Sequence, residues 1–212
     1  MTGAAGKQTV EAGYDLIAER YLSTKDAEDP NTVAALEKMA SGLEKGAAVL
    51  DLGCGAGVPA TRWLSRRFSV TGVDVSARQL ELARRLVSDA SFVKADMTEL
   101  DFEPGSFDAA VSLYAITHVP GAEQPGLVED VFRWLVPGGR FLATWATGEW
   151  EGEEKDWEGW GASMWWSNLD PDASLSMLRD AGFETESAKT LDDGDERWLW
   201  ILAKKPPRRI KR

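Results

Sequence analysis

Three glycines at alternate positions are the first feature of the sequence that could do chemistry. Gly53, Gly55 and Gly57 come directly after an apolar run that ends in Asp51 and Leu52, and a helical pattern follows them. A glycine-rich turn between a strand and a helix leaves the backbone open to a ligand and places a helix N-terminus beside it. Taken alone, the pattern fits either a ligand-binding loop or a tight turn that binds nothing.

Two further aspartates follow the next two apolar runs of the sequence. Asp74 ends the run 70–73, and Asp96 comes after the run 91–94. A carboxylate at the first position could accept the two hydroxyls of a ribose, and one at the second would lie near the amino group of an adenine. Either aspartate could instead cap the helix that follows it. Three suitable features at three successive strand ends favour a nucleoside-containing ligand.

Short apolar runs alternate with helical patterns from residue 46 onward, and these elements must position the three features. This order predicts a sheet built by right-handed β-α-β crossovers. A short turn at 191–195 permits only antiparallel pairing of the two strands beside it. We predict strands at 47–52, 70–73, 91–94, 107–114, 140–145, 183–190 and 197–204, and helices at 10–21, 31–43, 60–67, 77–87, 127–135 and 171–181.

The 212 residues fit a single domain with five segments. Residues 1–45 form an N-terminal helical lid, and 46–147 form the binding core. Residues 148–168, rich in Trp, Glu and Gly without a clear period, form a cap insertion over one end of the sheet. The final helix and hairpin take 169–204, and a basic tail follows at 205–212.

Composition excludes several classes of partner. Thirty-five acidic and 24 basic residues give a net charge of -11, which disfavours nucleic acid, and we expect the basic tail to be a solvated terminus. The single cysteine, Cys54, allows no internal disulfide, and we assign it no nucleophilic role. We find no apolar stretch long enough to span a bilayer and no targeting signal at the N-terminus. We therefore expect a cytoplasmic protein with no membrane partner and no metal, of unknown oligomeric state.

Four motifs resemble those of the class I S-adenosylmethionine-dependent methyltransferases, small-molecule type. The segments are 49–57 (VLDLGCGAG), 72–76 (GVDVS), 106–112 (SFDAAVS) and 137–141 (PGGRF), and the resemblance covers about residues 46–146. It implies an α/β fold, a Rossmann-like three-layer sandwich with a seven-stranded, mostly parallel sheet and an antiparallel terminal strand. A nicotinamide dehydrogenase also begins with a strand and a glycine loop, but its spacing requires glycine or alanine where Val58 stands.

The resemblance implies S-adenosyl-L-methionine as the cofactor and assigns a part of it to each motif. The loop at Gly53 approaches the methionine part above Asp51, and Asp74 accepts the ribose hydroxyls. Asp96 and the backbone of Met97 bind the adenine. The cofactor-binding residues implied in this way are Tyr21 as an aromatic lid, Asp51, Gly53, Gly55, Gly57, Asp74, Val75, Asp96, Met97, and Leu113 at strand four.

His118 is the sole histidine and follows the fourth predicted strand, near the expected entry of a methyl acceptor. With a pKa near neutrality it could act as a general base toward a hydroxyl or ammonium acceptor. It could equally bind the cofactor carboxylate or shape the pocket. The resemblance thus implies a methyltransferase acting on an O, N or S nucleophile of a small molecule. A cofactor-binding sensor or partner subunit without transfer activity fits the same motifs.

Ten tryptophans are unusual for this length, and six of them lie between residues 145 and 166. Aromatic walls favour planar or cationic acceptors. Alternatively, the rings only pack the cap onto the sheet. The residues that we predict to bind the substrate are Tyr14, His118, Trp145, Trp165 and Trp166.

Overall fold

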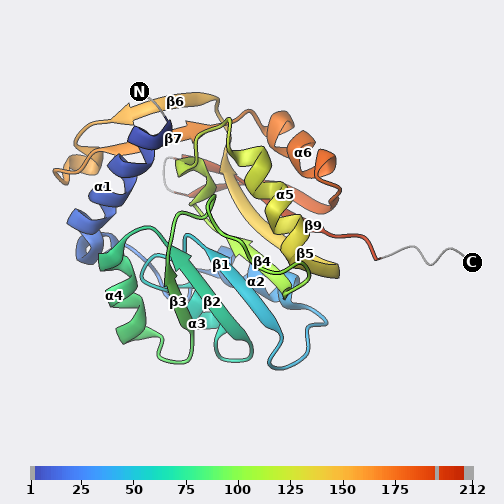
Figure 1. Cartoon of the computed structure of the whole chain (residues 1–212). Helices are drawn as coiled ribbons and strands as arrows, with labels where there is room; N and C mark the ends of the chain where they lie inside the picture. The colour runs from blue at the N-terminus through green and yellow to red at the C-terminus, as the bar shows by residue number, and fades with distance from the viewer. Residues whose placement is uncertain (1–2, 194–195, 208–212) are drawn as a thin grey trace, which may run out of the picture.

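A seven-stranded sheet forms the centre of the computed structural model, which describes residues 3–193 and 196–207 (Figure 1). Its strand order is β3-β2-β1-β4-β5-β9-β8. Strands β1 to β5 are mutually parallel where they pair, and β9 lies antiparallel between β5 and β8. The strands are β1 (Ala48–Leu52), β2 (Ser69–Asp74), β3 (Ser91–Lys94), β4 (Phe107–Ser112), β5 (Leu135–Ala146), β8 (Glu184–Asp193) and β9 (Glu196–Lys204).

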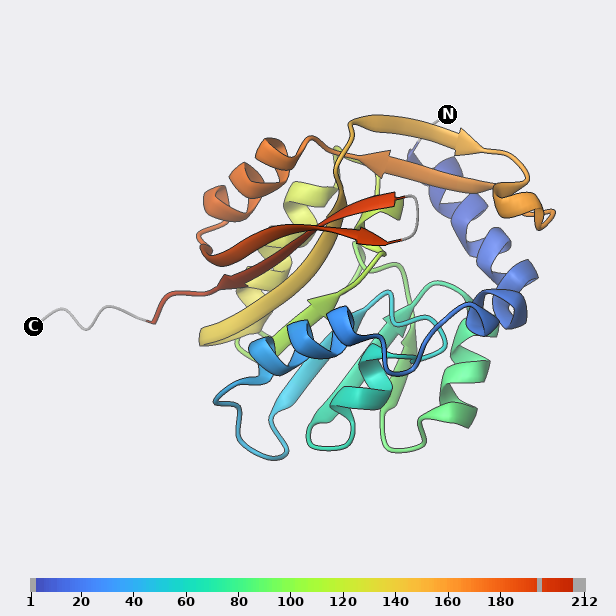
Figure 2. The ribbon, with the colours of Figure 1, turned by 180° about the vertical axis from the view of Figure 1, so that it is seen from behind.

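Helices cover both faces of this sheet and complete a three-layer sandwich. The helices are α1 (Gly3–Ser23), α2 (Pro30–Ala40), α3 (Ala60–Leu64), α4 (Ala77–Leu86), α5 (Gln124–Trp134) and α6 (Pro171–Asp180). Helices α5 and α6 lie on one face, while α2 and α3 lie on the other, as the views from front and back show (Figures 1 and 2). Each face has its own apolar core cluster. The predicted fold class is therefore confirmed.

Strand β1 explains why its sequence shows no polar alternation. Leu50 and Leu52 belong to the core under α5 and α6, whereas Val49 belongs to the core under α2 and α3. All three side chains have no exposed surface. A parallel strand covered on both faces needs apolar residues at consecutive positions, and this requirement produces the pattern seen in the sequence.

Several element boundaries differ from the prediction, and the largest difference is that α1 begins at Gly3 rather than at residue 10. The helix predicted over 60–67 is α3 and ends at Leu64, and strand β5 begins at Leu135 rather than at residue 140. The glycines that should precede β5 lie within it, because the Gly138 amide donates to the Lys205 carbonyl and the Lys205 amide donates to Gly139, both at 2.8 Å. Of the predicted basic tail, residues 208–212 lie outside the described residues.

The insertion at 148–168, for which the sequence predicted no helix or strand, contains a regular hairpin. Strand β6 (Trp150–Glu154) pairs antiparallel with β7 (Met164–Asn168), and a short 3-10 helix, η2 (Trp157–Gly159), lies between them. The hairpin packs beside α1 (Figures 1 and 2). A Cβ at Gly6 of α1 would lie 2.7 Å from the Trp165 ring, so the helix can approach the hairpin this closely only because glycine stands there.

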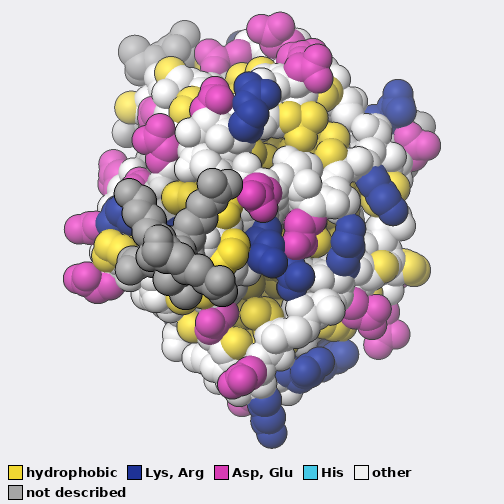
Figure 3. Space-filling model, turned by 90° about the vertical axis from the view of Figure 1, so that its right-hand side faces the viewer, with side chains coloured by type: hydrophobic (Ala, Val, Ile, Leu, Met, Phe, Trp, Pro, Cys, Tyr) yellow, Lys and Arg dark blue, Asp and Glu magenta, His cyan; other side chains and the backbone are white. Residues whose placement is uncertain are grey.

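The surface beside the C-terminal segment carries charges of both signs. Lys and Arg side chains lie among Asp and Glu side chains over the visible part of this face (Figure 3). Within residues 3–193 and 196–207, no helix combines the length and the apolar character needed to cross a bilayer.

Candidate functional site

A cavity lies at the carboxyl ends of the parallel strands, at the point where the strand order reverses between β1 and β4. This switch point is where open α/β sheets bind their ligands. An adjoining pocket shares six residues with the cavity: Tyr21, Gly53, Gly55, Gln79, Leu113 and Tyr114. The predicted site residues that line the cavity are Tyr14, Tyr21, Gly53, Gly55, Asp74, Val75, Asp96, Met97, Leu113 and His118, and Asp51 lines the adjoining pocket.

The glycine loop has a backbone that only glycine adopts without strain. Gly53, Gly55 and Gly57 have φ angles of 73°, 53° and 78°, all in the left-handed region. At Gly53 a Cβ would also lie 2.2 Å from the Cβ of Ala115, so a side chain there would collide with the segment after β4. Gly57 lines neither cavity, and its role is to let the chain turn into α3.

Asp51 lies behind the loop as a buried carboxyl group, with a side chain that is 2% exposed. Its Oδ2 accepts a hydrogen bond from Thr61 Oγ1 at 2.5 Å. Removal from water raises the pKa of Asp51 to about 7, although the Thr61 hydroxyl opposes this shift. The group is therefore in part protonated at neutral pH.

Asp74 holds the glycine loop at the wall of the cavity. Its Oδ2 accepts from the Gly55 amide at 2.8 Å, and its Oδ1 accepts from the Ser76 amide at 2.9 Å. Burial raises the pKa of Asp74 to about 6, against the effect of these amides. The alternative that Asp74 caps the following helix is wrong, because Ser76 is the N-cap of α4 and its Oγ accepts from Gln79.

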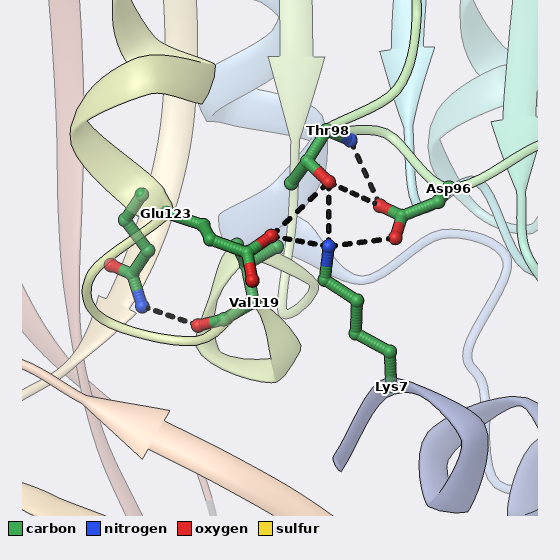
Figure 4. Close-up of polar contacts among 6 residues, drawn as sticks. Lys7, Asp96, Thr98, Val119 and Glu123 are labelled. Carbon is green, nitrogen blue, oxygen red and sulfur yellow. Dashed lines mark hydrogen bonds and ion pairs between the residues drawn. The ribbon is translucent and has the colours of Figure 1, made fainter. Parts of the chain in front are cut away.

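Asp96 lies at the next strand end, where a lysine from the far N-terminus meets it (Figure 4). Its Oδ1 accepts from the amide and the hydroxyl of Thr98, each at 2.9 Å, and its Oδ2 pairs with Lys7 Nζ at 2.8 Å. Lys7 also donates to Thr98 Oγ1 at 2.6 Å and to Glu123 Oε2. Sequence reasoning missed Lys7, because no spacing or motif links residue 7 to residue 96.

His118 lies at the end of the 3-10 helix η1 (Ile116–His118), with both ring nitrogens in hydrogen bonds. Nδ1 lies 2.7 Å from the Trp165 carbonyl oxygen, and Nε2 lies 2.9 Å from the Tyr14 hydroxyl. Since a carbonyl only accepts, Nδ1 is assigned the proton and Nε2 accepts from Tyr14. Burial raises the pKa of Tyr14 well above its usual value, which keeps this donor protonated.

The expectation of a near-neutral pKa for His118 is wrong. Burial lowers the pKa of His118 to about 4, although the Trp165 carbonyl favours the charged form. The imidazole is therefore neutral at physiological pH, and its one acceptor nitrogen is already engaged by Tyr14. These two facts disfavour direct general-base catalysis by His118.

Three tryptophans predicted to bind the substrate pack the protein instead and do not line the cavity. Trp145 has no exposed surface and donates from Nε1 to Gln124 at 3.3 Å within the core. Trp165 is 5% exposed and packs against α1, while Trp166 stacks on His118 with a ring-centroid distance of 4.2 Å. The cap therefore supports the Tyr14–His118 pair from behind.

Gln79 is a second residue that the sequence analysis missed. It lies on the first turn of α4, is 1% exposed, and lines both the cavity and the adjoining pocket. Its Oε1 and Nε2 have no hydrogen-bond partner among the residues that the structure describes. A buried amide without a partner is costly in a folded protein, so its two groups suit a polar ligand in the cavity.

A glycine loop, an acidic residue at each of two following strand ends and an unpartnered amide together define an α/β domain that binds a nucleoside-type ligand. Comparison with known proteins makes this class specific. Residues 49–139 match a family model described as a methyltransferase domain. Over this span the chain is similar to the methyltransferase family, and it has the fold of solved S-adenosylmethionine-dependent methyltransferases.

Two curated relatives and one solved structure illustrate the similarity. The sterol 24-C-methyltransferase of Candida albicans is 30% identical over 177 residues, which are 74% of this chain and 45% of that protein. Methyltransferase GfsG of Streptomyces halstedii is 39% identical over 106 residues, which are 46% of this chain and 37% of that protein. The chain therefore spans less than half of either relative.

The solved structure is that of the 1,6-didemethyltoxoflavin-N1-methyltransferase of Burkholderia thailandensis with bound 1,6-didemethyltoxoflavin and S-adenosylhomocysteine. It matches this chain with a TM-score of 0.74 and 19% identity, over 97% of this chain and 91% of that one. At this identity the match supports the fold.

The residues of the site fit S-adenosylmethionine, the cofactor of the family. At Gly55 a Cβ would meet only Gln79 Oε1, at 3.8 Å, so the loop has open space in front of it. Each Asp74 oxygen accepts one backbone amide and keeps acceptor capacity for a hydroxyl. The unpartnered Gln79 amide adds a donor and an acceptor.

Proposed function

We propose that this chain transfers a methyl group from S-adenosylmethionine to an O, N or S atom of a small molecule. The observation that carries this proposal is the Tyr14–His118 pair in the same cavity as the glycine loop and Asp74. The pair offers a polar group on an otherwise largely apolar wall, at the place where a methyl acceptor would meet the cofactor.

We assign the parts of the cofactor to the residues at the strand ends. Asp74 and the neighbouring Val75 hold the ribose, and Asp96 with the Met97 backbone holds the adenine. The loop at Gly53, with Asp51 behind it, faces the methionine part. Leu113 and the lid residue Tyr21 close the pocket, and this assignment is supported by their common place on its lining.

The bound cofactor supplies an activated methyl group, so the protein contributes chiefly positioning and exclusion of water. Tyr14 donates its proton to His118 Nε2 and keeps oxygen lone pairs that can accept a hydrogen bond from a hydroxyl or amine acceptor. The Trp165 carbonyl fixes the imidazole from the other side. We therefore propose that Tyr14 orients the acceptor and that His118 orients Tyr14.

The proposal does not specify which atom of the small molecule receives the methyl group. The relative from Candida albicans is named a sterol 24-C-methyltransferase, and the solved structure is named an N1-methyltransferase. Proteins similar to this chain are therefore named for methylation of different atoms. Only Tyr14 and His118 of the five predicted substrate-binding residues line the cavity. An aromatic cage for an amine is therefore not part of the proposal.

The test incubates the full chain with methyl-labelled S-adenosylmethionine and a panel of phenols, alcohols, amines and thiols. Label should pass to at least one class of methyl acceptor. Tyr14→Phe should lower turnover, because the hydrogen bond between the Tyr14 hydroxyl and the methyl acceptor is lost, and it should leave the affinity for S-adenosylhomocysteine within about twofold. Tight cofactor binding without transfer to any compound would favour a sensor or partner subunit. Absence of binding would refute the proposal.

A further inference from the structure

We propose that Lys7 is a positioning residue that aims the Asp96 carboxylate at the 6-amino group of the cofactor's adenine. The inference rests on the proposed function and adds a residue of the N-terminal helix to the adenine site. Lys7 lines the cavity from α1, and its ammonium group lies 2.8 Å from Asp96 Oδ2 (Figure 4).

The hydrogen bonds of Lys7 leave it no proton for a ligand. An ammonium group has three N–H donors, and Lys7 directs them to Asp96 Oδ2, to Thr98 Oγ1 at 2.6 Å and to Glu123 Oε2. Its side chain is only 19% exposed. Lys7 therefore acts on the ligand through the groups that it holds.

The hydrogen bonds of Asp96 leave one direction open. A carboxylate offers about four acceptor positions, two on each oxygen. The amide and hydroxyl of Thr98 occupy Oδ1, and Lys7 occupies one position on Oδ2. The position that is left suits a single N–H donor such as the adenine amino group, and it would repel the carbonyl oxygen that replaces this group in hypoxanthine.

The charges of Lys7, Asp96 and Glu123 agree with a role of Lys7 in positioning Asp96. Partial burial works to raise the pKa of Asp96, but Lys7 and Thr98 outweigh it and keep that pKa below its usual value. Glu123 is the second carboxylate that contacts Lys7 and Thr98. Without the lysine, Asp96 and Glu123 would face each other with no cation between them, and Asp96 Oδ2 would lose the partner that fixes its direction.

A second lysine that pairs with the same helix offers a matched control. Lys94, at the end of β3, pairs with Glu11 of α1 at 2.7 Å, so it also ties this helix to the sheet edge. Its side chain is 49% exposed, and its pair involves neither Asp96 nor Thr98. Loss of Lys94 removes the same charge and a similar tether but leaves the carboxylate of Asp96 in place.

The experiment measures the affinity of two probes by calorimetry: S-adenosylhomocysteine and S-inosylhomocysteine, in which a carbonyl replaces the adenine amino group. For Lys7→Met we expect about tenfold weaker binding of the adenosine compound, the loss of one well-placed hydrogen bond to a charged group. Binding of the inosine compound should change by about twofold or less. The preference for adenine, which is the ratio of the affinities for the adenosine and the inosine compound, should therefore fall. Lys94→Met should keep both affinities, and Lys7→Arg should restore most of the preference.

Each outcome separates the inference from the proposed function. Equal weakening for both probes in Lys7→Met would show a general structural role and overturn the inference, as would an unchanged preference. The unfolding temperature without ligand shows whether each variant is folded. If Lys7→Met does not fold, Glu123→Gln takes its place in the test. That variant removes one of the contacts that hold Lys7, so it should reduce the preference for S-adenosylhomocysteine over S-inosylhomocysteine. If the wild-type chain binds neither probe, the proposed function fails together with the inference.

Discussion

Replacement of Asp74 by Asn tests the ribose assignment through the pH dependence of cofactor binding. In the ligand-free chain, burial raises the pKa of Asp74 to about 6. The ionised carboxylate accepts hydroxyl protons on both oxygens, whereas the protonated form gives up one acceptor. Because protonation removes the binding form, affinity should fall as the pH falls through 6.

The size of the effect follows from the fraction of ionised Asp74. At pH 8 about 99% of the group is ionised, and at pH 5 about 9% is. If only the ionised form binds well, the Kd for S-adenosylhomocysteine should rise about tenfold between these values, or about 1 kcal/mol. Asp96 adds nothing to this slope, because its pKa is lowered and it stays ionised over the whole window.

Calorimetric titration at pH 5, 6, 7 and 8 provides the measurement. The Asp74→Asn variant keeps the size of the side chain but cannot ionise, so it should bind more weakly at pH 8 and lose most of the pH dependence. Asp51 also titrates in this range, with a pKa of about 7 that the charge of Asp74 helps to raise, so the difference between wild type and variant contains the titration of Asp74 and its coupling to Asp51. The same slope in both proteins would refute the assignment.

Three further predictions concern stability and the histidine. The folded pKa of Asp51, about 7, exceeds its reference value of 3.8, so its stabilising effect is full at low pH and is lost as the pH rises through 7. From pH 5 to pH 8 the unfolding free energy in urea should fall by about 3 kcal/mol through this group, and Asp51→Asn should lack this fall. Gly53→Ala should cost about 3 kcal/mol through its left-handed backbone and the collision with Ala115; Gly105→Ala, with a φ of 70° and open space around it, should cost only about 1 kcal/mol. An NMR titration of the single imidazole should show a midpoint near pH 4, and a midpoint near 6.5 would contradict the buried, neutral state.

The two strands within the cap are elements that the sequence did not predict. The sequence of the cap shows no two-residue alternation, yet residues 150–168 contain a regular hairpin. Strand β7 packs against both α1 and the η1 segment, and buried side chains occupy consecutive positions such as Met164 and Trp165. A strand buried on both faces resembles an irregular apolar segment when it is read alone.

Local sequence determined the cofactor side of this protein. The buried strand and the glycines after it are neighbours in the chain. The aspartates recur at the ends of successive strands. The fold rule that brings these ends to one edge therefore sufficed to place Gly53, Asp74 and Asp96 together. The antiparallel final hairpin followed from a short turn in the same way.

Only the tertiary structure decided how the rest of the site is arranged. Tyr14 meets His118 across 104 residues of sequence, and Lys7 meets Thr98 across 91, and no periodicity reports such pairs. The low pKa of His118 and the burial of Trp145 have the same origin. The imidazole is covered by α1 and the β6–β7 hairpin, and the indole by the core cluster that includes α5 and α6, so both depend on packing between segments far apart in the chain.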